Sequence, residues 1–284
     1  GDQPGANLPN FDDSDFTNIN LPHDYSIDQD FSPYFEAESA YKPGGVGNYR
    51  KSFVIDDINL EEKQVFIYFD GVYQNSTTYI NGEKLGFNPY GYNPFAYDLS
   101  PYLKKDEENL LAIRCDHQVP SSRWYSGSGI YRSVDILVKN RLNLGIYGPK
   151  IDYEIADKLG KINVKSEVCN NYKDPKTFKL KHSLYFKNKL IKDITNEEIT
   201  IDANSKEDID LNFQVENISL WDLDKPNLYQ LRSEILLEDE SIDEYVTDIG
   251  FRVLEKNPQT GISLNGKNIK IKGVCLHHDN GALG

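Results

Sequence analysis

The 284-residue sequence has no methionine, only three cysteines, and no uninterrupted apolar run of about 18 residues. The absence of such a run excludes a membrane-spanning helix. Cys115, Cys169 and Cys275 are odd in number and far apart, so they predict neither a disulfide framework nor a cysteine metal site. The sequence predicts no metal and no cofactor. Because no methionine can start the chain, we expect a processed or excised segment, which leaves cytoplasmic, periplasmic and secreted locations open.

Positive charge is also scarce, with 31 Lys and Arg against 45 Asp and Glu and a net charge of −14 at pH 7. A chain this acidic repels phosphate backbones, which argues against nucleic acid as a partner. Lys179 and Lys181 alternate with Phe178, Leu180 and, further on, Leu184. This spacing is typical of the solvated face of a strand rather than of a binding patch.

The first half of the chain shows the period-two alternation of β-strands. Residues 1–35 are rich in Asp, Asn and Pro and predict an irregular arm, whereas the segments after residue 48 alternate or are apolar throughout. Asn81-Gly82 separates two such segments and favours a hairpin turn. Glycines 44, 45 and 47 lead into a strand pattern and not a helix, so they do not predict a phosphate-binding loop.

A second series of alternating segments begins at about residue 142. Roughly seven short strands over about 110 residues, separated by turn residues, are typical of an immunoglobulin-like sandwich. The spacing of two cysteines and a tryptophan that marks antibody domains is missing. Tyr229, which precedes an alternating segment, is a candidate corner residue packed between strands.

The last stretch of the sequence differs from both series. Ile262–Leu264 and Asn268–Lys272 flank Asn265-Gly266, which predicts a tight hairpin. Val274-Cys275-Leu276 then forms an apolar run suited to a strand buried on both faces. The run ends in His277-His278-Asp279, and polar side chains at the tip of a buried strand are where barrel enzymes carry their chemistry.

Several segments resemble family 2 glycoside hydrolases, the family of β-galactosidases, β-glucuronidases and β-mannosidases. Tyr25 and Asn48 stand where the family usually has tryptophan, and Asp248-Ile249 stands where it usually has phenylalanine. The HHDNGALG ending looks most like the β-galactosidase branch. The resembling segments are LPHDY (21–25), GGVGNYRK (44–51), SSRWYSGSGIYR (121–132), TDIGFR (247–252) and NGKNIKIKGVCLHHDNGALG (265–284).

The resemblance implies a mainly β fold in three parts. These are a jelly-roll, galactose-binding-like sandwich over residues 1–141, an immunoglobulin-like sandwich over 142–254, and the first hairpin and strand of a truncated TIM barrel over 255–284. The implied function is that of the N-terminal portion of a retaining exo-acting β-glycosidase, most like a β-galactosidase that hydrolyses terminal β-D-galactosides. The two catalytic glutamates would lie beyond Gly284, so this chain would hold no catalytic residue and would be inactive by itself.

Two alternatives stay open at this point. A β-glucuronidase or β-mannosidase would share these segments, and a non-catalytic carbohydrate-binding or scaffold module would share the two sandwiches. The barrel-like ending argues against a free module. The expected partner is a carbohydrate that contains a β-galactoside, and a homo-oligomer is left open.

Six residues are candidates for substrate binding. The resemblance implies that Asp279 hydrogen-bonds sugar hydroxyls, with His278 and His277 supporting it or contacting the sugar. The alternatives for the histidines are a zinc site or a purely structural role, but neighbours on a strand point to opposite faces and cannot easily share one metal. Arg123, Trp124 and Tyr125 lie in a glycine-rich loop that the resemblance places near the barrel mouth. They would line outer substrate subsites or, alternatively, pack between domains.

Overall fold

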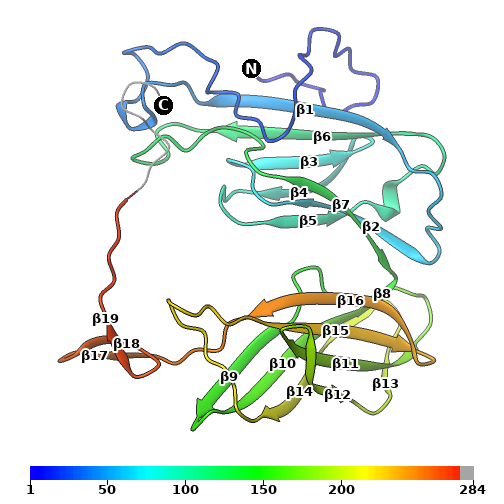
Figure 1. Ribbon diagram of the computed structural model, residues 1–284. Coiled ribbons are helices and arrows are strands. Elements are labelled where there is room, and N and C mark those ends of the chain that lie inside the picture. Colours follow the sequence, from blue (N-terminus) through cyan, green and yellow to red (C-terminus); the bar gives the residue numbers. More distant parts are fainter. Residues whose placement is uncertain (276–284) are drawn as a thin grey trace. The chain divides into compact units, whose positions relative to one another are not determined.

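The structure of the protein is a computed structural model in which residues 1–275 are described. It forms two compact units, Gly1–Val138 and Lys139–Gly273. Both are built almost entirely from β-sheets, which confirms the prediction of a mainly β chain (Figure 1). Within the described residues, the helices are too short and too polar to cross a membrane. The predicted boundaries at 141/142 and 254/255 stay predictions.

The first unit is a sandwich of two antiparallel sheets. One sheet has the order β1-β6-β3-β4, formed by β1 (Gly45–Val54), β6 (Glu108–His117), β3 (Ser76–Ile80) and β4 (Glu83–Asn88). The other has the order β5-β2-β7, formed by β5 (Phe95–Asp98), β2 (Lys63–Phe69) and β7 (Val134–Asn140). Short 3₁₀ turns, η1 (Ala37–Ser39) and η2 (Ser100–Tyr102), lie in the connections.

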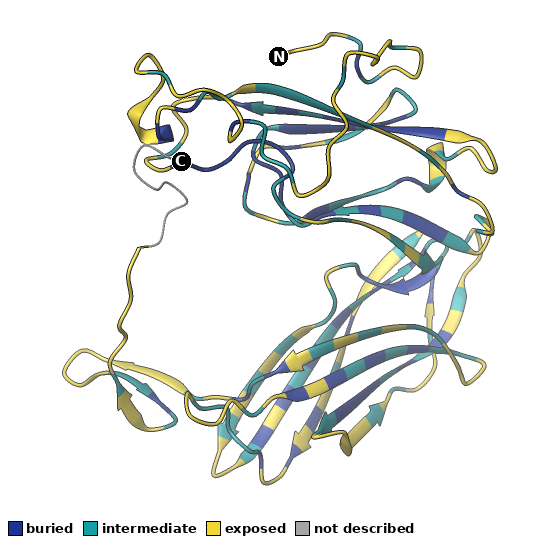
Figure 2. Ribbon diagram, turned by 45° about the horizontal axis from the view of Figure 1, so that its top comes forward, coloured by how far each residue is buried: buried dark blue, intermediate teal, exposed yellow. Residues whose placement is uncertain are grey.

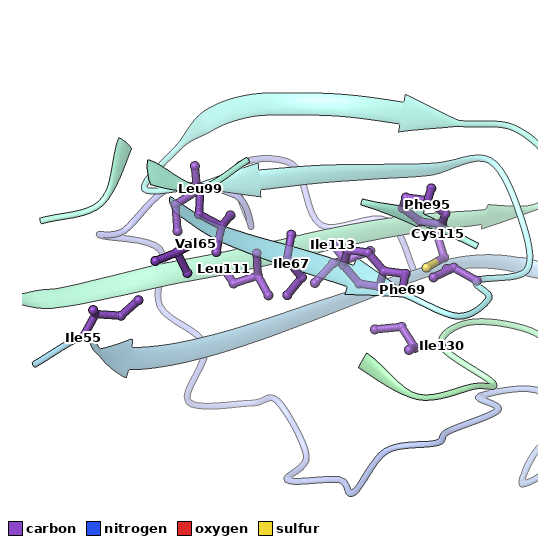
Figure 3. Close-up of a cluster of buried hydrophobic side chains, with 12 residues drawn as sticks. Ile55, Val65, Ile67, Phe69, Phe95, Leu99, Leu111, Ile113, Cys115 and Ile130 are labelled. Carbon is purple, nitrogen blue, oxygen red and sulfur yellow. The ribbon is translucent and has the colours of Figure 1, made fainter. Parts of the chain in front are cut away.

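The core of this unit follows from strand alternation. In Figure 3, Val65, Ile67 and Phe69 of β2 gather with side chains of β6. Every second residue of a strand points to the same face, so the odd-numbered positions of both strands fill the space between the sheets. Cys115 lies among them and is fully buried.

The arm over residues 1–35 contains neither helix nor strand, as expected from its composition. Side chains of the neighbouring sheet hold it in place. The Arg50 guanidinium donates to the Asp13 carboxylate at 2.7 Å and to the Leu8 carbonyl at 2.9 Å. Arg114 pairs with Asp2 through two hydrogen bonds of 3.0 Å each. These charged donors from β1 and β6 therefore hold the arm in place without regular secondary structure.

The second unit is another two-sheet sandwich, with alternating buried and exposed residues along its strands (Figure 2). Its first sheet runs β14-β10-β8, with β9 also paired to β10, and its second runs β12-β11-β15-β16, with β13 also paired to β11. The strands are β8 (Leu142–Leu144), β9 (Lys150–Ala156), β10 (Leu159–Asn170), β11 (Lys176–Phe186), β12 (Lys189–Thr195), β13 (Ile199–Ile201), β14 (Ser205–Val215), β15 (Tyr229–Leu237) and β16 (Glu240–Ile249).

Tyr229 is the packed corner residue that the sequence predicted. Its ring is stacked on Phe186 at a centroid distance of 4.4 Å and meets Phe251 edge-on at 5.0 Å. Its buried hydroxyl accepts a hydrogen bond of 2.9 Å from the Ser219 backbone N–H. The residue therefore ties the loop before β15 to the core of the second unit.

A small third sheet, β17-β18-β19, is formed by the last strands of the second unit. The predicted hairpin is confirmed, because Asn265 and Gly266 have φ angles of 52° and 77° between two paired strands. The Asn265 side chain accepts from Val253 N–H and donates to the Trp221 carbonyl, at 2.9 Å each. The strands are β17 (Leu254–Asn257), β18 (Gly261–Leu264) and β19 (Lys267–Ile269).

The strand expected over 274–276 is not formed by its described residues. Val274 is 93 % exposed and Cys275 is exposed as well, and neither belongs to a strand. Leu276 lies outside the described residues. An apolar strand needs neighbours on both sides to satisfy its backbone groups, and residues 1–273 offer this segment no paired strand.

Candidate functional site

The loop over residues 121–132 joins β6 to β7 at one edge of the first sandwich. Its backbone is fixed by a bridge in which Tyr73 N–H donates to the Gly129 carbonyl at 2.9 Å and Gly129 N–H donates back at 2.6 Å. Gly129 has a φ of 101°, and a Cβ there would lie 2.0 Å from the Tyr49 hydroxyl. Only glycine fits this position, so the loop conformation depends on Gly129.

The segment over residues 21–25 lies beside this loop. His23 N–H donates to the Ile130 carbonyl at 2.7 Å, and Tyr25 N–H donates to the Ser128 carbonyl at 3.1 Å. The His23 Nδ1 atom is 3.0 Å from the Tyr49 hydroxyl. The segment over residues 21–25 is therefore a hydrogen-bonded structural corner.

Asp24 is the centre of that corner. Its Oδ1 atom accepts the backbone N–H groups of Ser26 and Ser128, both at 2.9 Å. Its Oδ2 atom accepts the hydroxyl of Tyr125 at 2.6 Å. Burial first, and then this hydrogen bond to a carboxylate, raise the pKa of Tyr125 well above its ordinary value. Tyr125 is therefore a buried, protonated side chain of the loop that joins it to Asp24.

A buried histidine that the sequence reasoning missed lies under the same loop. His117 Nδ1 is 2.6 Å from the Ser128 hydroxyl, and Nε2 is 3.1 Å from the Ser121 hydroxyl. The Ser26 hydroxyl also donates to Ser128, at 2.6 Å. Burial lowers the pKa of His117 to about 4, so the ring is neutral near pH 7. The available signal was the alternation of β6, which places His117 on the same inward face as Cys115.

Serine, histidine and aspartate thus meet here without forming a nucleophilic triad. In a triad the carboxylate orients the imidazole, whereas Asp24 bonds the backbone of Ser128. Ser128 is 0 % exposed and His117 3 % exposed, so no substrate can reach the hydroxyl. The cluster is a hydrogen-bonded foundation for the loop.

Two of the predicted site residues lie on the surface of this foundation. Trp124 is 36 % exposed, and its indole N–H donates to the Tyr92 hydroxyl at 3.2 Å. Arg123 beside it is exposed. The loop therefore brings Arg123 and Trp124 to the surface and turns Tyr125 inward. Asp279, His278 and His277 lie outside the described residues. Within residues 1–275, no group of His, Cys, Asp and Glu side chains is arranged to hold a metal ion.

Two models of known protein families match this chain, one mainly over each unit. The family model described as "Glycosyl hydrolases family 2, sugar binding domain" matches residues 7–140, and that described as "Glycosyl hydrolases family 2" matches residues 145–252. The chain belongs to glycosyl hydrolase family 2. The sugar-binding-domain match contains the whole loop over 121–132 and the corner around Asp24.

Individual members of glycosyl hydrolase family 2 match along the full chain. "Beta-galactosidase BoGH2A" of Bacteroides ovatus is 38 % identical over 292 residues, covering 100 % of this chain and 34 % of that protein. A β-glucuronidase of Formosa agariphila is 29 % identical and covers 93 % of this chain and 29 % of that protein. A crystal structure of a family 2 member from Bacteroides cellulosilyticus has a TM-score of 0.87 at 33 % identity, over 99 % of this chain and 38 % of that one. The chain thus spans about a third of the length of these relatives.

Proposed function

We propose that this chain is the N-terminal portion of a retaining exo-acting β-galactosidase that removes terminal β-D-galactosides. The observation that carries the proposal is the 38 % identity to a β-galactosidase over the whole chain. The ending that resembles the β-galactosidase branch supports it as well. A carbohydrate with a terminal β-galactoside is the proposed substrate.

In this proposal, hydrolysis requires a catalytic barrel in addition to this chain. Retaining glycosidases use two carboxyl groups about 5–5.5 Å apart, one as nucleophile and one as acid and base. The Asp24 carboxylate cannot serve, because three donors from the surrounding loops occupy both of its oxygens. In this proposal the barrel supplies both catalytic carboxylates, and the chain described here supplies contacts to the substrate.

The proposed contacts come from two segments. Asp279 hydrogen-bonds sugar hydroxyls through its carboxylate, and His278 and His277 support it or contact the sugar. A site built around a hydroxyl discriminates strongly against sugars that lack it there, because its own polar group would be left unpaired. Arg123 and Trp124 line outer subsites from the loop over 121–132, and Tyr125 holds that loop in position.

A direct test compares the 284-residue chain with a longer protein extended through the catalytic barrel. The longer protein should hydrolyse nitrophenyl β-galactoside, and the 284-residue chain should show no turnover. Asp279→Asn in the longer protein should reduce kcat/KM by about tenfold or more, with Asp28→Asn as an unaffected control. Turnover by the 284-residue chain would contradict the proposal.

A second candidate is a β-glucuronidase, favoured by the relative of that name in Formosa agariphila. Preference of the longer protein for nitrophenyl β-glucuronide would support it in place of the β-galactosidase. Sugar binding without hydrolysis in the longer protein would instead favour a non-catalytic module.

A further inference from the structure

Aromatic side chains from three loops of the first unit converge beside the 121–132 loop. Tyr73 follows β2, Tyr90 and Tyr92 lie between β4 and β5, and Trp124 and Tyr131 lie between β6 and β7. Two of them are strongly exposed for such large rings, Tyr90 at 60 % and Trp124 at 36 %. Trp124 was a predicted site residue, whereas the two tyrosines before β5 were not.

The rings are arranged in layers. Tyr73 is buried and meets Tyr92 edge-on at a centroid distance of 5.3 Å. Half-buried Tyr92 in turn meets exposed Tyr90 edge-on at 5.6 Å and accepts the indole N–H of Trp124 at 3.2 Å. Tyr90, Tyr92 and Trp124 together therefore form one outer aromatic surface, supported from below by Tyr73.

The loops that carry this surface are rigidly held. The Tyr131 hydroxyl donates to the Gly91 carbonyl at 2.8 Å, which joins the two loops directly. A Cβ at Gly91 would lie 2.1 Å from the Tyr73 ring, so the chain passes too close for any other residue. The Tyr73 hydroxyl donates to Ser121 at 3.0 Å, and its ring packs against His117 at 5.0 Å. The exposed rings are thus preorganised, which lowers the entropy lost when a ligand packs on them.

We propose that Tyr90, Tyr92 and Trp124 form a stacking surface for a pyranose ring of a neutral saccharide, with galactose configuration preferred. This inference deepens the function proposed above, because it adds Tyr90 and Tyr92 to the substrate contacts of Trp124. Pyranose rings present C–H bonds on one face, which pack on aromatic faces, and hydroxyls at the rim, which need polar neighbours. In galactose the axial O4 leaves the C–H groups of C3, C4 and C5 together on one face.

The surroundings favour a sugar over an apolar protein surface. Exposed Asn93 and Arg123 and half-buried Ser122 adjoin Tyr92 or Trp124 in the sequence and carry amide, guanidinium and hydroxyl groups that can bond sugar hydroxyls. The aromatic hydroxyls of Tyr90 and Tyr92 add further polar atoms within the surface itself. The net charge of −14 makes a polyanionic saccharide a poor match.

Trp124 provides a built-in probe, because the chain has only two tryptophans. The 284-residue chain is titrated with methyl β-D-galactopyranoside, methyl β-D-glucopyranoside and sodium glucuronate while tryptophan fluorescence is recorded. A Trp124→Phe chain gives the signal of Trp221, which is subtracted. We expect a saturable change of Trp124 emission with the galactoside at a Kd of about 1 mM, and weaker binding of the other two sugars.

Three variants make the test specific. Tyr90→Ala removes one exposed ring and should weaken galactoside binding by about three- to tenfold. Tyr92→Phe keeps the ring but removes the acceptor of the indole N–H, and it should weaken binding by about two- to fivefold. Tyr147→Ala removes an equally exposed ring, 62 % exposed, from the second unit and should leave binding unchanged. Circular dichroism confirms that each variant is folded.

The outcomes separate this inference from the proposed function. Absence of a saturable change with every sugar, or equal binding by Tyr90→Ala and the parent chain, would overturn the stacking surface. Hydrolysis of β-galactosides by the longer protein would still support the proposed function in that case. Saturable, Tyr90-dependent binding would support the stacking surface even if the longer protein hydrolysed none of these sugars.

Discussion

The Asp24 carboxylate joins two segments that are about 100 positions apart in the sequence. It accepts hydrogen bonds from Ser26 beside it and from Tyr125 and Ser128 across the corner. Hydrogen bonds to a charged acceptor are about twice as strong as those between neutral groups. Asp24 is therefore one of the groups that hold the 121–132 loop, and with it Trp124, in position.

Replacing Asp24 tests this role in stability. Asp24→Ala leaves two backbone N–H groups and one buried hydroxyl without their acceptor, so the free energy of unfolding should fall by about 3 kcal/mol. Urea denaturation followed by circular dichroism measures the change. Asp28→Ala removes an exposed carboxylate of the same segment and should change stability by less than about 0.5 kcal/mol. If the two substitutions lowered the free energy of unfolding equally, the stabilising role of Asp24 in the corner would be wrong.

His182 makes the stability of the second unit depend on pH. Its Nδ1 atom lies 2.9 Å from the Ser233 hydroxyl, and its buried Nε2 atom has no hydrogen-bond partner among the described residues. Burial lowers the pKa of His182 from 6.5 to about 4 in the folded state. The unfolded chain, with the ordinary pKa, therefore binds a proton at pH values where the folded chain does not.

The sign of the pH effect follows from this difference in proton uptake. Above pH 6.5 both states are neutral and full stability is present; between about pH 6.5 and 4 the unfolded state gains the proton first, so stability falls. The loss approaches about 3 kcal/mol. His182→Leu should reduce this acid-induced loss, measured as urea midpoints at several pH values. An unchanged pH profile in the variant would exclude His182 as its source, and Ser233→Ala, which keeps the imidazole, serves as the control.

At the scale of elements, the sequence predicts best what local chemistry decides. Asn81-Gly82 and Asn265-Gly266 form the predicted turns, because Asn and Gly readily adopt the positive φ that this turn needs at both positions. Ser100 begins the 3₁₀ turn η2 but provides no side-chain cap for it. Instead its hydroxyl accepts from Val65 N–H at 2.8 Å, a contact across 35 positions that no local pattern reveals. Val274 and Cys275 lie in no strand, so their apolar character alone does not form one.

Gly266 in the turn between β18 and β19 and Gly273 after β19 form a matched pair of glycines. Gly266 has a φ of 77°, whereas Gly273 does not have positive φ, and a Cβ at either would meet nothing within 4 Å. Gly266→Ala should therefore cost about 1 kcal/mol through backbone strain alone, and Gly273→Ala should cost almost nothing. Hydrogen exchange of the Asn265 amide, which donates to the Val253 carbonyl at 2.8 Å, measures the local opening. Equal exchange in both variants would show that the turn does not need the positive φ.

At the scale of the whole molecule, alternation in the sequence predicted strands in both halves and an immunoglobulin-like sandwich in the second, whereas the sandwich of the first half was implied by the family resemblance. Alternation predicted about seven strands for the second sandwich, whereas β8 through β16 make nine in residues 142–249. The excess comes from pieces such as β8 and β13, which have three residues each and are too short to show a period. The candidate site was predicted in part. The segments around Asp24 and Trp124 were recognised, but their contact and the rings of Tyr90 and Tyr92 arise only from the fold.

The three cysteines lie in different parts of the chain and differ in burial. None is in a disulfide, as predicted, and each has a different environment: Cys115 is buried in β6, Cys169 is half-buried in β10, and Cys275 is exposed. Burial raises the pKa of Cys115 strongly, and burial followed by the charge of Glu167 raises the pKa of Cys169 to about 11. Since the thiolate is the reactive form, both effects slow the reaction of the inner two thiols.

We therefore expect three distinct rates when the native chain meets a thiol reagent at about pH 8. Cys275 should react first, Cys169 slowly, and Cys115 only when the first unit opens. Raising urea should speed Cys115 and Cys169 at different concentrations, because the two units have separate cores. Cys275→Ser should remove only the fast phase, and Cys169→Ser only the intermediate one. If Cys115 reacted as fast as Cys275 in the native chain, or if the urea dependences of Cys115 and Cys169 coincided, the two-unit arrangement of cores would be wrong.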